Sequence, residues 1–250
     1  MRTIGAELIK LKRSMAWVIV LILPIVLAVT GVVNTLVDGA PLEDGWHTLW
    51  LRSVVFYGLF PLAIGIGVLA SLVWRSEHHG SNWNALMSGP TRSSSIVVAK
   101  TAAVALPAVT MQLVMLGAVV VLGKTVFGLP GMLPAEYLLV SGLVALSSVP
   151  VAALQSGLSM LLRSFAAPIA VALVGSGLSA ALLTMNVEAV IFVSPYGLVS
   201  RATQLGTESF ADDGIIGVAI VVSILIAAAL LTTLVIATVD RVLEHRDTRI

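Results

Sequence analysis

The chain has no cysteine and little charge: only 11% of its 250 residues are Asp, Glu, Lys or Arg, whereas 58% are hydrophobic. Soluble domains carry about a quarter charged residues, so this composition excludes a soluble globular protein. It also excludes a disordered chain, which would be polar and charged. The missing cysteines exclude disulfides and thiolate chemistry, and the net charge of +1 argues against nucleic-acid binding. The chain is therefore a membrane protein.

Catalytic and metal-binding motifs are also missing. There is no H-E-x-x-H sequence, and the adjacent His78 and His79 would diverge by about 100° on a helix. Lys124 follows Gly123 as in a phosphate-binding loop, but five residues, not the required four, lie between Gly117 and Gly123. The sequence offers no set of polar residues that could converge on an active site within the membrane, which argues against an intramembrane enzyme. We therefore predict no catalytic residue, no metal site and no cofactor on this chain.

Six uncharged stretches of 22 to 26 residues divide the chain, each long enough to cross a bilayer as a helix. They are 14–37, 53–74, 101–123, 137–162, 164–187 and 214–239. Ionisable side chains are absent from them, which disfavours an ion-coupled transporter. Pro24, Pro61, Pro107 and Pro150 fall inside the first four and predict kinks, either for packing or as hinges. Small residues spaced by four from Ala172 to Ala180 predict close helix contact in the fifth.

The basic residues predict the orientation. With the N-terminus inside, 11 of the 14 Lys and Arg residues lie on the cytoplasmic side, so both termini are expected there. Three segments lie outside the spans. Residues 1–14 form an amphipathic surface helix, because Ile4, Leu8 and Leu11 face away from the basic residues. Residues 75–95 form a cytoplasmic loop, and residues 188–213 a re-entrant or interfacial helix pair interrupted at Pro195.

The loop after the second span has the features of a short docking helix. Ser81 is a suitable N-cap and Pro90 a stop, and between them Trp83, Leu86 and Met87 share one apolar face. This face is buried either against the chain's own N-terminal helix or lipid headgroups, or in a cleft of a cytoplasmic partner.

This loop resembles that of the permeases of the ABC-2 type exporter family, which have a basic N-terminal surface helix and six spans. The matching residues are Glu77, Gly80, Leu86, Pro90, Arg92 and Lys100. In compact size the chain is most similar to the lantibiotic-immunity type permeases. The resemblance implies an all-α permease domain over residues 1–250 in the bacterial plasma membrane, which exports an amphipathic or hydrophobic substrate such as an antimicrobial peptide, a drug or a lipid.

The resemblance also implies the partners. Two copies of a separate ABC ATPase would hold ATP and Mg²⁺, and a second permease, identical or related, would complete the path. Glu77, Trp83, Leu86 and Met87 would transmit force from the ATPase. Residues of spans 2 and 5 would line the substrate path, although ordinary lipid or packing contacts explain them equally well, and three residues of the external segment would form a gate. The path residues are Phe56, Phe60, Met185 and Asn186, and the gate residues are Phe192, Pro195 and Tyr196.

The alternative function is a non-transport membrane scaffold, or an immunity protein that sequesters a toxin or anchors a sensor. It requires no docking helix for an ATPase. A neighbouring reading frame for an ABC ATPase would favour the exporter.

Overall fold

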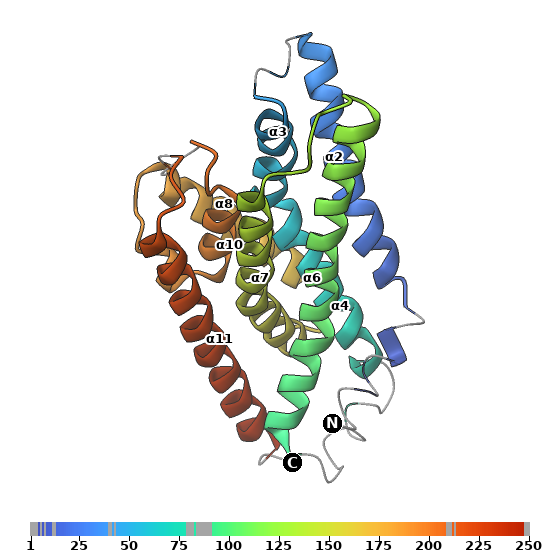
Figure 1. Ribbon diagram of the computed structural model, residues 1–250. Coiled ribbons are helices and arrows are strands. Elements are labelled where there is room, and N and C mark those ends of the chain that lie inside the picture. The colour runs from blue at the N-terminus through green and yellow to red at the C-terminus, as the bar shows by residue number, and fades with distance from the viewer. Residues whose placement is uncertain are drawn as a thin grey trace.

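A computed structural model describes residues 5, 7, 9–11, 14–39, 42, 44–78, 83, 92–208, 212 and 214–247. Over this part of the chain the regular structure is entirely helical, and the helices form an elongated bundle (Figure 1). Their bounds are α2 Ala16–Asp38, α3 Trp46–Leu59, α4 Pro61–His78, α6 Ser93–Thr125, α7 Ala135–Leu161, α8 Ala166–Thr184, α9 Val190–Val193, α10 Pro195–Thr203 and α11 Val218–Asp247. The predicted all-α class is confirmed.

Each uncharged stretch falls on a helix of membrane-spanning length or on a bent pair. Within the described residues, α2, α6, α7, α8 and α11 are long and apolar enough to cross a bilayer. The second stretch is not one continuous helix, because α3 and α4 meet at an angle of 47° on either side of Phe60. Pro61 begins α4, where a proline costs little because the first helical N–H has no partner within the helix. Counting this pair as one span gives the six that the sequence predicts.

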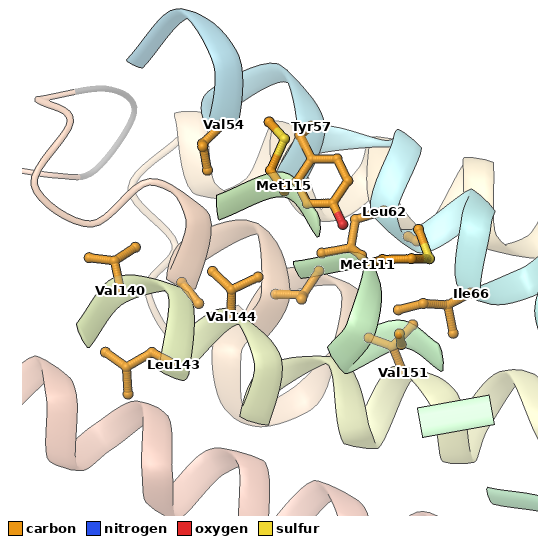
Figure 2. Close-up of a cluster of buried hydrophobic side chains, with 14 of the residues drawn as sticks. Val54, Tyr57, Leu62, Ile66, Met111, Met115, Val140, Leu143, Val144 and Val151 are labelled. Atoms are coloured by element: carbon orange, nitrogen blue, oxygen red, sulfur yellow. The ribbon is translucent and has the colours of Figure 1, made fainter. Parts of the chain in front are cut away.

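Helix α7 lies at the centre of the bundle and packs against α4, α6, α10 and α11. Its apolar side chains meet those of α3, α4 and α6 in one continuous core (Figure 2). Val144 and Val151 come from α7, Met111 from α6, and Leu62 and Ile66 from α4. This core joins helices that are far apart in the sequence.

Large apolar side chains cover the outer faces of α2, α8 and α11. Examples are Val33, Val174 and Leu234, each at least half exposed. Because these helices have the length and composition of membrane spans, their exposed faces are suited to contact lipid tails. Only 17% of the most apolar 18-residue segment of α11 is buried in the bundle, compared with 61% for α7, so α11 lies at the edge of the bundle and α7 at its centre.

Two short helices, α9 and α10, connect α8 to α11 and lie against the bundle. They are separated at Ser194, whose hydroxyl accepts a hydrogen bond from the Gly197 N–H and caps α10. Pro195 occupies the first turn. The predicted interruption of this segment is therefore confirmed. Every residue of α10 is buried, and Gly175 of α8 lies so close to the Tyr196 ring that a Cβ there would approach it to 2.5 Å. Ala172, Ser176 and Ala180 are buried, and a Cβ on Gly67 of α4 would lie 3.5 Å from that of Ala172, so the predicted close contact along α8 is confirmed.

Candidate coupling site at the lower end of the bundle

The end of α4, the start of α6 and the end of α11 lie together at what we call the lower end of the bundle (bottom of Figure 1). Four charged side chains meet there. We call Glu7, Lys10, Glu77 and Lys100 the charge cluster. The Lys100 Nζ lies 2.8 Å from one carboxylate oxygen of Glu77 and 2.8 Å from one of Glu7. The Lys10 Nζ lies 2.9 Å from Glu77 and 3.0 Å from Glu7.

The charge cluster is buried on its α6 side and open on its N-terminal side. The Lys100 side chain is 1% exposed, whereas that of Lys10 is 52% exposed. The Lys100 ammonium also lies 5.1 Å from the centre of the Trp74 ring, a cation–π distance. A buried ammonium needs paired carboxylates to offset its lost hydration. The Lys10–Glu77 pair therefore ties the N-terminal segment to α4, and the Glu7–Lys100 pair ties it to α6.

The carboxylates next to Lys10 change its pKa. Partial burial alone would lower the pKa of Lys10, but hydrogen bonds to Glu77 and Glu7 outweigh burial and raise the pKa above its usual value. Because the folded-state pKa is raised, the stabilisation from Lys10 is fully present below its ordinary pKa. It is lost only as the pH rises through the raised value. Lys10 thus stays charged at neutral pH.

The ring of Trp83 packs against the last turns of α4. It stacks on the His78 ring with centroids 6.1 Å apart and lies 6.2 Å from the Trp74 ring. Trp74 in turn donates a hydrogen bond from Nε1 to the Ser156 hydroxyl of α7, and Met160 completes this second apolar cluster. Trp83 is half-buried. The predicted docking residue is therefore connected to α4, and through it to the central helix.

The other predicted coupling residues divide into two groups. Glu77 lies in the charge cluster, and Arg92 is the exposed N-cap of α6, its carbonyl accepting from the Ser95 and Ile96 N–H groups. The remaining four, Gly80, Leu86, Met87 and Pro90, lie outside the described residues. The sequence motif included Lys100 but did not identify Glu7 or Lys10 as its neighbours. Their spacing by three on a helix was the available signal.

The four predicted path residues do not converge on one cavity in the part of the chain that the structure describes. Phe56 and Met185 are exposed on the surface of the bundle, the latter by 72%. Asn186 has φ of +59° just after the end of α8, a left-handed conformation that asparagine tolerates. Phe60 lies at the α3–α4 break, and a Cβ on Gly177 of α8 would be 3.5 Å from its ring.

The predicted gate residues differ in their surroundings. Phe192 is exposed, whereas Tyr196 is buried and its hydroxyl accepts a 2.7 Å hydrogen bond from the Gln155 amide. Gln155 lies 20 residues along α7, about 30 Å from its Ala135 end at 1.5 Å per residue. Helix α10 therefore reaches far down the bundle. Among the described residues no set of three His, Asp or Glu side chains is placed to hold a metal ion.

The fold is that of a multi-pass membrane protein, and its candidate coupling site at the lower end combines charged and aromatic side chains. A family model described as ABC-2 family transporter protein matches residues 3–179, and the chain belongs to this family. Comparison with curated proteins and with solved structures gives no match. Members of the ABC-2 family are the membrane components of ABC transporters; they associate with an ABC ATPase and are not themselves the catalytic subunit.

Proposed function

We propose that the chain is the permease subunit of an ATP-driven exporter in the bacterial plasma membrane. It moves an amphipathic or hydrophobic substrate, such as an antimicrobial peptide, a drug or a lipid, out of the cell or the membrane. Two ATPase subunits supply ATP and Mg²⁺, and a second permease, identical or related, forms the other half of the path. We also propose, from the compact size of the chain, that it is of the lantibiotic-immunity type.

The observation that carries this proposal is the link from the loop after α4 to the helices. Trp83 rests on His78 and Trp74, and Trp74 is bonded to α7. Directly beside them, Glu77 is paired with Lys100 of α6. An ATPase that displaces the loop therefore moves α4 together with its neighbours. The buried Tyr196, bonded to Gln155 deep in the bundle, supports a re-entrant role for α9 and α10.

Trp83→Ala tests the coupling. Large aromatic residues are common binding hot spots, and their truncation costs about 2 kcal/mol or more, which is about a thirtyfold loss of affinity. We expect the variant to lose ATPase binding and substrate efflux while still inserting into the membrane, since Trp83 lies outside the spans. The measurement is co-purification of the ATPase at matched membrane abundance, with Leu86→Asp expected to behave in the same way.

The matched control is Trp17→Ala, which removes an exposed tryptophan from the lipid-facing side of α2. It should retain the ATPase. If Trp83→Ala also keeps its partner and transports normally, the loop is only a connector and the scaffold function becomes the better explanation.

The proposed orientation has its own test. Reporters fused after Ser88 and Arg246 should signal a cytoplasmic location, and reporters after Gly39 and Gly131 an external one, because the basic residues concentrate at the lower end. The measurement is the activity of compartment-specific reporter enzymes. An external signal from Ser88 would contradict both the orientation and the docking role of the loop.

A further inference from the structure

The C-terminal helix α11 has no role in the coupling described so far. Its buried side chains form two groups at different heights, an upper group between Ile224 and Leu231 and, near the lower end, Leu243. None of residues 232–242 between them is buried. Leu231 and Leu243 lie about 18 Å apart along the helix axis at 1.5 Å per residue. Helix α11 is thus packed tightly against the bundle at two separate places.

The lower contact joins α11 to the coupling site. Leu243 is 1% exposed and belongs to the same buried cluster as Trp74 of α4, against which Trp83 also packs. Helices α6 and α7 contribute the remaining buried members of this cluster. Because protein interiors are packed without spare space, an enclosed leucine moves with its neighbours or leaves a void. A displacement of Trp83 and α4 is therefore passed to the lower end of α11.

The upper contact joins α11 to α9 and α10, the short helices that carry the predicted gate residues. Helix α11 contacts both of them. Ile224 lies in the same core cluster as Ile191 of α9 and Leu198 of α10. The buried ion pair between Arg201 and Asp212 adds a link from α10 to the connection that leads into α11. One helix therefore contacts both the coupling site and the gate segment.

Helix α11 is suited to carry a movement along its length. It has 30 residues without proline or glycine, and so a length of about 45 Å. Sharp kinks in helices arise mainly at prolines, and α2, α6 and α7 each contain one. An apolar cavity of about 240 Å³ lies between α7 and α11, lined from α11 by residues between Leu234 and Val242. Helix α11 is therefore straight and has space beside it for a tilt.

We propose that α11 transmits the movement of the coupling site to α9 and α10, and that Leu243 is the positioning residue through which the movement enters the helix. In this role Leu243 touches neither the substrate nor ATP and holds the lower end of α11 in the cluster around Trp74. The role rests on the proposed export function, because an ATPase must supply the movement.

The test follows the accessibility of α9 in the purified complex of the chain with its ATPase. Because the chain has no cysteine, a single Ile191→Cys substitution at a position 4% exposed reports movement of α9. Its rate of reaction with N-ethylmaleimide is measured with and without Mg-ATP. We expect Mg-ATP to raise this rate in the otherwise unchanged chain. Leu243→Ala should reduce the response about tenfold, a typical size for a coupling between two sites.

Three variants separate positioning from simple support of the fold. Leu243→Met nearly conserves the side-chain volume and should restore the response. Leu230→Ala is the matched control, since it makes the same substitution at a position of α11 that is 60% exposed, and it should respond like the unchanged chain. Thr233→Pro kinks α11 between its two contacts and should abolish the response although Leu243 is present. All variants should retain the ATPase on co-purification.

Each contrary result has a distinct meaning. A normal response in Leu243→Ala would overturn the role of Leu243, and a normal response in Thr233→Pro would overturn transmission along α11. Loss of the ATPase from Leu243→Ala and Leu243→Met alike would reduce Leu243 to a structural support. Failure of the export proposal looks different, because no ATPase would then co-purify even with the wild type, and both proposals would fall together.

Discussion

Replacing Lys100 with methionine should destabilise the protein by about 3–5 kcal/mol, the usual cost of removing one partner from a buried ion pair. The Lys100 ammonium is the buried centre of the charge cluster and pairs with both Glu77 and Glu7. Without it two carboxylates face each other with only the half-exposed Lys10 between them. We expect a lower unfolding temperature in detergent and earlier proteolysis of the N-terminal segment.

Two further variants make this result specific. Lys124→Met removes an exposed lysine at the opposite end, whose ammonium donates to the carbonyls of Leu129 and Gly131 and lies 5.7 Å from the centre of the Trp46 ring. It should cost about 1–2 kcal/mol, less than Lys100→Met, because it leaves no buried charge unpaired. The double variant Glu77→Gln with Lys100→Met leaves the Glu7–Lys10 pair balanced and should recover part of the loss. A Lys100→Met protein as stable as Lys124→Met would contradict the role of the cluster.

Asp212→Ala should have a similarly large effect at the connection between α10 and α11. One oxygen of Asp212 accepts a 2.8 Å hydrogen bond from the Arg201 guanidinium, and the other accepts from the N–H groups of Thr207, Glu208 and Gly214. The Asp212 side chain is fully buried. Its removal leaves a buried guanidinium unpaired, which costs about 3–5 kcal/mol. Thermal unfolding of the purified protein measures the loss.

Glu188→Ala is the control for this substitution. Glu188 is an exposed carboxylate in the segment before α9, and its replacement should change stability by less than about 0.5 kcal/mol. Asp212→Asn keeps the shape and one acceptor oxygen, so an intermediate loss is expected. Equal stability of the Asp212→Ala and Glu188→Ala proteins would show that the ion pair is dispensable.

The spans were predictable because a bilayer imposes one simple requirement, an uncharged stretch of sufficient length. The break in the second span was not. Each of the first four uncharged stretches contains one proline. Pro24, Pro107 and Pro150 lie inside continuous helices, whereas Pro61 begins a new one. In membrane helices, neighbouring groups can satisfy the backbone that a proline frees. The outcome therefore depends on tertiary packing, which no local pattern contains.

The candidate site was predictable only where its residues follow one another in the chain. Glu77 and Trp83 belong to one loop motif, and the structure places both at the lower end. The partners of Glu77 come from segments 67 residues before it and 23 residues after it. The bond between Tyr196 and Gln155 likewise joins separate helices. Such pairs depend on how the helices assemble, and a single sequence carries no record of that.

The bend at Phe60 gives α4 the mechanics of a lever. Helix α4 has 18 residues and so a length of about 27 Å, with Phe60 before its first residue and Glu77, paired with Lys10 and Lys100, near its last. A rotation of about 10° at Phe60 displaces the lower end by about 5 Å. Above Phe60, α3 is held by the buried rings of Trp46, Trp50 and Tyr57 and need not follow. Under the proposed coupling, a push at the loop would therefore tilt α4 together with the segments paired to its lower end, while α3 keeps its place.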